Sequence, residues 1–160
     1  MSESEFYTIR GYHLQDHREM SDSMEDYLEM IYRHTRQEKF IRVNQLAGLL
    51  NVKPPSASKM AGKLRSCGMI AFEPYGLIQL TPRGEEEGAY LLHRHTVLHR
   101  LFCAINHSDN ELALVEKIEH HFGRDTILNI ERFLDQRDEA HAPSFQSASH
   151  NDHPASPIQP

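Results

Sequence analysis

Tryptophan is absent from this 160-residue chain, and cysteine occurs only twice. Cys67 and Cys103 form no CxxC pair, so we expect two free thiols rather than a thiolate metal site or a redox motif. No apolar run approaches the roughly 20 residues of a membrane span. The first nineteen residues also lack the apolar stretch of a signal peptide. We therefore predict a cytoplasmic protein with no membrane partner.

Common catalytic motifs are also missing. The sequence has no HExxH zinc-protease motif, no phosphate-binding P-loop and no GxSxG nucleophile motif. No motif therefore supports an enzyme, and there is little support for a metal-storage protein or a metal-dependent hydrolytic enzyme. The length suits one domain, or two small ones that share a core.

Basic residues are concentrated in one segment of an acidic chain. The formal net charge is −6, yet residues 41–83 hold six bases and one acid, which gives that segment +5 and leaves −11 elsewhere. A basic block in an acidic protein is typical of a phosphate-binding surface. The acidic remainder would suit a cation site and discourage non-specific DNA binding when that site is empty.

The same segment has the pattern of a winged helix-turn-helix. Residues 43–50 predict a short helix with Leu46, Ala47, Leu49 and Leu50 inside, and Pro55 begins a second helix that Gly68 ends. Two strand-like runs, 69–72 and 77–80, then predict a hairpin wing. In such a motif the second helix reads DNA.

Short hydroxyls and basic side chains on this segment suit phosphates and base edges. The predicted DNA-binding residues are Arg42, Lys53, Pro55, Ser56, Ser58, Lys59, Lys63 and Tyr75. The alternative is a winged-helix fold used for protein contacts.

Helical patterns flank the reader on both sides. The expected helices cover residues 24–36, 82–104, 109–121 and 124–137, with Thr81 as the cap of the second. We predict a mostly α fold, with an N-terminal arm, a winged helix-turn-helix domain, a helical metal-binding and dimerisation domain, and a tail. Their expected bounds are 1–21, 22–84, 85–141 and 142–160. The polar arm and the tail, which has few apolar residues, are predicted to be flexible.

Six metal-type ligands occur in three clusters on the expected helices. Residues three or four apart share a helical face, so each cluster can present its side chains to one point. Four carboxylates and two imidazoles suit manganese or iron(II) better than a thiolate-seeking ion. The ligands are Asp26, Glu29, His95, Glu116, Glu119 and His120.

Each cluster has an ordinary explanation when taken alone. Acidic helix faces are common on solvated surfaces, and a lone histidine such as His95 is often satisfied by a hydrogen bond. Asp26 and Glu29 also suit the dipole of a first helical turn. The metal hypothesis depends on the three clusters together, placed on both sides of a DNA reader.

Several stretches in this order resemble the manganese-responsive branch of the diphtheria-toxin-repressor-like metalloregulators. They are SMEDYLEMIY (23–32), VNQLAGLLNVKPPSASKMAGKL (43–64), LTPRG (80–84), HRH (93–95) and VEKIEHH (115–121). The resemblance covers residues 23 to about 140. It implies a homodimer that binds a palindromic operator on double-stranded DNA when metal is bound.

The resemblance also implies which metal binds. All six family ligand positions are matched by the residues above, and manganese-type members hold two ions bridged by the glutamates that match Glu116 and Glu119. Iron-type relatives place a methionine at the position of Asp26 and a cysteine at that of Glu116, so manganese is favoured. His99 stands where an acid is expected, one turn after His95.

The predicted function is a manganese-dependent repressor of metal-uptake genes that binds about two Mn²⁺ per chain. Fe²⁺ stays possible, so one alternative is an iron(II)-responsive member of the family. The other is a winged-helix DNA-binding protein that does not respond to metal.

Overall fold

The computed structural model describes residues 19–73 and 76–141. The predicted mostly α fold is confirmed, with a helix-turn-helix and a small antiparallel sheet. Its elements are α2 (Asp22–Thr35), β1 (Ile41–Arg42), α3 (Val43–Leu49), α4 (Pro54–Ser66), β2 (Ile70–Glu73), β3 (Leu77–Leu80), α5 (Pro82–Asn106), α6 (Leu112–Ile118), the 3-10 turn η2 (Glu119–His121) and α7 (Arg124–His141). The predictions for Tyr75, most of the arm and the tail lie outside the described residues.

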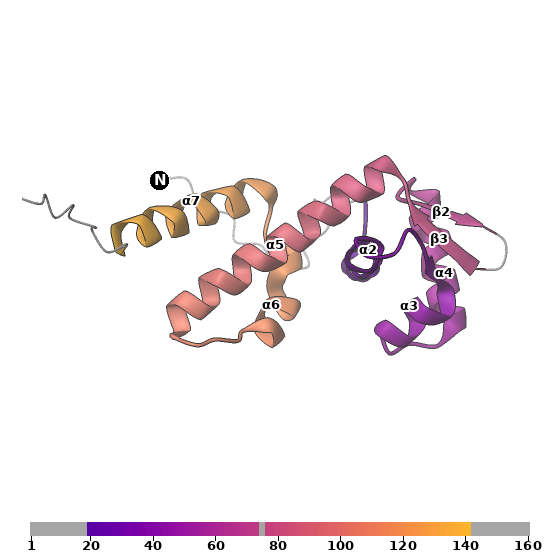
Figure 1. Ribbon diagram of the computed structural model, residues 1–160, viewed down its shortest axis with the longest axis horizontal. Coiled ribbons are helices and arrows are strands. Elements are labelled where there is room, and N and C mark those ends of the chain that lie inside the picture. The colour runs from indigo at the N-terminus through magenta and orange to yellow at the C-terminus, as the bar shows by residue number, and fades with distance from the viewer. Residues whose placement is uncertain (1–18, 74–75, 142–160) are drawn as a thin grey trace, which may run out of the picture.

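The long helix α5 connects two halves of the molecule (Figure 1). The N-terminal half contains α2, α3, α4 and the sheet, and α2 packs against the first part of α5. The C-terminal half contains α6 and α7, which both pack along the later part of α5. Within the described residues, no helix is long and apolar enough to cross a membrane.

The helix-turn-helix forms close to its predicted bounds. Helix α4 begins one residue earlier than expected, with both prolines in its first turn, where a missing N–H costs no intrahelical bond. Its inner face buries Ala57, Ala61 and Leu64. The expectation that Leu49 lies inside is wrong, because its side chain is 51% exposed at the end of α3. Helix α3 has only seven residues, so it buries a narrow stripe.

The wing belongs to a three-stranded sheet rather than to a hairpin alone. Strand β1 pairs antiparallel with β3, with Ile41 opposite Ile78, and the strand order is β1-β3-β2. Two residues are too few to show alternation, so β1 was not predicted. This pairing places Arg42 beside the wing, at the start of α3.

The start of α5 is fixed by a cap and by close packing. Thr81 accepts a hydrogen bond from the Gly84 amide at 3.0 Å and donates one to the Gly68 carbonyl at 2.7 Å. A Cβ on Gly84 would lie 1.8 Å from the Met69 carbonyl oxygen. The glycine of the LTPRG stretch therefore lets the long helix approach the wing.

The expected single helix over 109–121 is wrong in one respect that matters for the site. It divides into α6 and the 3-10 turn η2, so Glu119 and His120 leave the α-helical repeat that would stack them above Glu116.

Candidate metal centre

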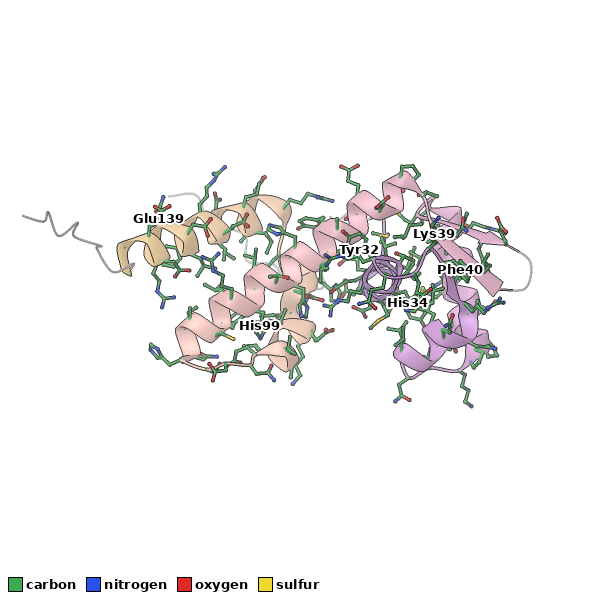
Figure 2. The ribbon with its side chains drawn as sticks, viewed as in Figure 1. Tyr32, His34, Lys39, Phe40, His99 and Glu139 are labelled. Carbon is green, nitrogen blue, oxygen red and sulfur yellow. The ribbon has the colours of Figure 1, made fainter. Side chains whose placement is uncertain are left out.

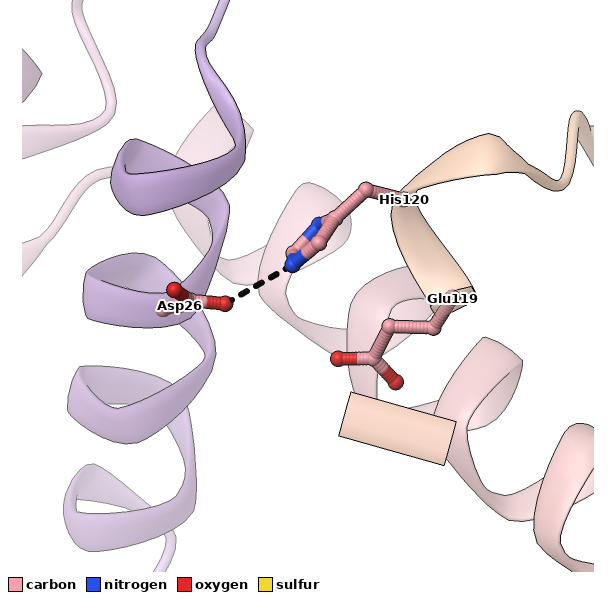
Figure 3. Close-up of side chains that lie close together, drawn as sticks. All are labelled: Asp26, Glu119 and His120. Atoms are coloured by element: carbon pink, nitrogen blue, oxygen red, sulfur yellow. Dashed lines mark ion pairs between the residues drawn. The ribbon is translucent and has the colours of Figure 1, made fainter. Parts of the chain in front are cut away.

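Two groups of candidate ligands lie where α2, α5 and η2 meet. Within each group, one possible ligand atom from each residue lies within 4.8 Å of the others. The first group is Asp26, Glu119 and His120, and the second is Glu29, His95 and Glu119. Glu119 belongs to both groups and its side chain is 1% exposed. Figure 3 shows Asp26 on α2 facing the imidazole of His120, with the Glu119 carboxylate beside them. The geometry suits two neighbouring cations that share one carboxylate.

The second group is held together by a buried hydrogen bond. The Nδ1 of His95 lies 2.9 Å from Oε2 of Glu119, and this bond raises the pKa of His95 against the opposing effect of burial. Glu116 lies at the edge, 3.8 Å from the same nitrogen, with a side chain that is 58% exposed. Partial burial and the charge of Glu119 raise the pKa of Glu116. Among the described residues Glu116 is in neither group, so its bridging role stays a prediction.

His120 uses both ring nitrogens on carboxylates of α2. Its Nε2 lies 3.0 Å from Oδ1 of Asp26, and its Nδ1 lies 2.8 Å from Oε2 of Glu25. The hydrogen bonds to Asp26 and then Glu25 raise the pKa of His120 to about 10. A protonated imidazole therefore ties η2 to α2, and a metal ion at Nε2 would have to replace that proton.

Glu25 and Arg94 form a buried ion pair that the sequence interpretation missed. The Nη2 of Arg94 donates to Oε2 of Glu25 at 2.6 Å, the oxygen that also faces His120. Burial raises the pKa of Glu25, but the bonds from His120 and Arg94 outweigh it, so the pKa is lowered. By accepting a hydrogen bond from Nδ1 of His120, Glu25 orients the imidazole ring so that Nε2 points toward Asp26. Carboxylates orient metal-binding histidines in the same way. The sequence feature that could have indicated this pair is its position next to candidate ligands, since Glu25 precedes Asp26 and Arg94 precedes His95.

Glu29 also has a basic partner on its own helix. Arg33, one turn later, donates to Oε1 of Glu29 through Nε at 2.9 Å and through Nη2. Both residues line a cavity of about 70 Å³ with Asp26, Met30, Leu50 and Glu116. Asp26 and Glu29 of α2 therefore face the same small cavity as Glu116.

His99 lies outside both ligand groups of the described residues. It sits further along α5, on the side toward α6 (Figure 2). Its Nε2 accepts a hydrogen bond from the backbone amide of Glu111 at 3.3 Å and lies 3.6 Å from Sγ of Cys103. His99 therefore holds the loop that leads into α6.

The donor set fits a hard or borderline divalent ion. Each group offers carboxylate oxygens and one imidazole nitrogen, and none of the ligands is a thiolate or thioether. Such oxygen-rich sets suit manganese and iron(II), which expand readily beyond four ligands.

The predicted DNA-binding residues that the structure describes gather at one end of the N-terminal half. All are exposed: Arg42, Lys53, Pro55, Ser56, Ser58, Lys59 and Lys63. A cavity of about 330 Å³ opens between the start of α3, helix α4 and the wing, lined in part by Arg42 and Ser58. The wing and the exposed face of α4 thus form one surface, and its contacts with DNA stay a prediction.

Comparison with known proteins places this architecture among regulators. The family model described as "Iron dependent repressor, N-terminal DNA binding domain" matches residues 19–77. An uncharacterised HTH-type transcriptional regulator of Methanocaldococcus jannaschii is 34% identical over 120 residues, covering 73% of this chain and 96% of that protein. The HTH-type transcriptional regulator MntR of Lysinibacillus sphaericus is 37% identical over 106 residues, covering 66% and 76%.

A solved structure shows the same fold. The crystal structure of the metal-dependent transcriptional regulator MtsR superposes with a TM-score of 0.62 at 27% identity, covering 72% of this chain. The chain spans about half the length of that protein, 55%.

Proposed function

Because the chain belongs to the diphtheria-toxin-repressor-like family of iron-dependent repressors, we propose that it is a manganese-dependent repressor of metal-uptake genes. The family consists of metal-dependent DNA-binding transcriptional regulators rather than enzymes. The observation that carries the proposal is the pair of ligand groups that share Glu119, at the seam between the DNA-binding half and the rest of the chain.

Metal binding would act by tying α2 to η2 and α5. Asp26 and Glu29 belong to the helix that packs against the reader, whereas His95, Glu119 and His120 come from the long helix and η2. Two divalent ions add four positive charges, which take the formal charge from −6 to −2. An ion that bridges both sides would fix the reader relative to α5. Metal and DNA binding are then reciprocally coupled, typically by about 1–3 kcal/mol.

Manganese is favoured over iron(II) by ligand chemistry. Asp26 supplies a hard, charged oxygen, and Glu116 does the same at the edge of the site, where the resemblance places softer ligands in iron-type relatives. The likeness to the MntR regulators supports the same choice. Iron(II) is the second candidate, because it accepts the same oxygen and nitrogen donors.

A homodimer is part of the proposal. Four large apolar side chains of the C-terminal half are between 45% and 60% exposed: Ile105, Leu112, Leu128 and Phe133. Exposed apolar residues in this number suit a protein interface. A symmetric dimer would present two α4 helices about 34 Å apart, the spacing of one DNA turn, and so bind a palindromic operator. Regulation of this kind takes place in the cytoplasm, where we place the protein.

The test is operator binding with and without manganese. Duplex DNA would be selected by the protein from a random library with Mn²⁺ present, and affinity then measured with Mn²⁺, with anaerobic Fe²⁺ and with a chelator. We expect at least about tenfold tighter binding with Mn²⁺, which is 1.4 kcal/mol of coupling. Equal affinity with the chelator would instead support a metal-independent DNA-binding protein.

One substitution tests the shared ligand. Glu119→Gln keeps the size of the buried side chain but removes its charge, so it should leave a folded protein whose DNA affinity no longer rises with Mn²⁺. The matched control is Glu86→Gln, an exposed glutamate on α5. Normal manganese activation of Glu119→Gln would remove Glu119 from the site.

A further inference from the structure

We infer that Arg33 competes with a divalent ion for the Glu29 carboxylate, and so lowers the affinity of the Glu29 half of the metal centre. This inference rests on the proposed function. It concerns a residue that belongs to neither ligand group of the described residues and that the sequence interpretation did not use.

The Arg33 side chain occupies one of the two carboxylate oxygens of Glu29. Two of its nitrogens, Nε and Nη2, donate to the same Oε1 of Glu29. The Glu29 side chain is 8% exposed and that of Arg33 is 38% exposed, so the pair lies at the mouth of the site rather than on open surface. Glu29 has the His95–Glu119 pair as its neighbours in the ligand group. Any ion bound there would meet the Arg33 guanidinium at its edge.

A guanidinium and a divalent ion cannot share this carboxylate without cost. Arginine keeps its positive charge throughout the physiological pH range, so the competition is not relieved by deprotonation. An ion that takes Oε1 of Glu29 must break charge-assisted hydrogen bonds, which are about twice as strong as neutral ones. An ion on either oxygen of Glu29 would experience the repulsion of the nearby guanidinium.

The structure offers a place for the displaced side chain. Arg33 lines the small cavity that holds Asp26, Glu29 and Glu116, and it also lines a larger cavity of about 410 Å³ with Arg36, Gln37 and Leu92. Rotation about the long side chain would move the guanidinium from the first cavity to the second. Arg33 is therefore a movable cation at the entrance to one half of the site.

The two halves of the centre should then differ in affinity. Arg33 donates to Oε1 of Glu29 in the Glu29 group. The hydrogen bonds and ion pairs of Asp26 and Glu119 among the described residues go instead to His120 and His95. Removing the guanidinium should tighten binding in the Glu29 half and leave the other half nearly unchanged. Arg33 thus sets the manganese concentration at which the second ion binds.

The experiment titrates Mn²⁺ into the full-length protein without DNA, following the free ion by electron paramagnetic resonance. Arg33→Ala should bind the weaker ion roughly tenfold more tightly, the scale of a lost charge-assisted bond. Arg33→Lys, which keeps a charge but not the two-nitrogen contact, should give a smaller gain. Lys39→Ala is the matched control, because it removes an equal charge from an exposed position shortly after α2 and lines neither cavity, so it should leave both binding steps unchanged.

Three results would overturn the inference. They are unchanged binding by Arg33→Ala, weaker binding by that variant, or an equal gain in Lys39→Ala, which would indicate a general charge effect. Thermal unfolding checks that each variant is folded. The proposed function itself fails if Glu119→Gln binds Mn²⁺ as well as the wild-type protein does, or if neither protein binds it. Failure of the proposed function can therefore be distinguished from failure of the inference about Arg33.

Discussion

The two halves of this molecule bury their apolar residues very differently. The N-terminal half and the start of α5 share one continuous core, which includes Leu28, Ile31, Leu64 and Ile78. The C-terminal half has a small separate core of Val97, Leu98, Val115 and Ile127. It also exposes several large apolar side chains. The first half therefore has a large core of its own beside the exposed Phe40, Leu49 and Val52, whereas the second sets four exposed apolar side chains against a much smaller core.

Between the halves lies a polar seam rather than a shared apolar core. It contains buried charged groups from both sides: Glu25, Glu29, Arg94, His95 and Glu119. Buried charges are stable only when paired, so this seam holds the halves together through specific ion pairs that a metal ion could rearrange. A joint of this kind responds to protons and cations, as an apolar joint would not.

The largest expected effect comes from breaking the seam. Arg94→Ala removes one of the two cations that pair with the buried Glu25 and leaves only His120, so we expect a loss of about 3 kcal/mol in the free energy of unfolding. The control is Arg100→Ala, which removes ion pairs to Asp135 and Asp138 on exposed surface and should cost no more than about 1 kcal/mol. Urea unfolding measures both. Equal losses would mean that the seam is no more important than the surface.

The seam should also make stability depend on pH. The pKa of His120 is raised from 6.5 to about 10, so its contribution is fully present below pH 6.5 and is lost as pH rises through 10. With a chelator present, the melting temperature of the wild-type protein should fall over this range. His120→Gln should show a shallower fall, while His93→Gln, at a half-exposed position, should behave like wild type. Parallel profiles for all three would contradict the protonated His120.

Substitutions of exposed aromatic residues should have an intermediate effect, on dimerisation, that differs between the two halves. Phe133→Ser removes a 59% exposed aromatic ring from the C-terminal half and should weaken dimerisation by at least about 1 kcal/mol, or fivefold. Phe40→Ser, at a 38% exposed position in the N-terminal half, should leave the dimer unchanged. Sedimentation equilibrium measures both constants. A weaker dimer in Phe40→Ser alone would place the interface on the other half.

The smallest expected effect concerns the DNA-binding surface. Lys59→Ala should weaken operator binding and reduce the slope of log affinity against log salt by about one, because one phosphate contact is lost. Manganese binding to the free protein should not change, since Lys59 is exposed on α4, away from the ligand groups. Lys117→Ala, an exposed lysine of the C-terminal half, is the control for net charge. An unchanged slope in Lys59→Ala would mean that α4 does not contact the backbone there.

The sequence by itself determined which elements form and which side chains can share a face. The capped start of α5 and the helix-turn-helix could be predicted, because caps and prolines act within a single element. The candidate ligands were proposed on similar grounds, from spacings of three or four residues, and their role stays a prediction. Strand β1 could not be predicted, since its two residues form a strand only by pairing with β3.

Only the tertiary structure decided how the candidate ligands divide into two groups and which charged side chains contact them. Glu25 meets His120 across 95 positions of sequence and Arg94 across 69, and no local pattern records such contacts. The break between α6 and η2 brings Glu119 into both ligand groups and leaves Glu116 at the edge. Arg33 lies beside Glu29 because of simple helical spacing, yet its position at the mouth of the candidate metal centre depends on how α5 and η2 pack against α2. Spacing along a helix fixes the direction of a side chain, whereas the partner it finds is set by the packing of distant elements.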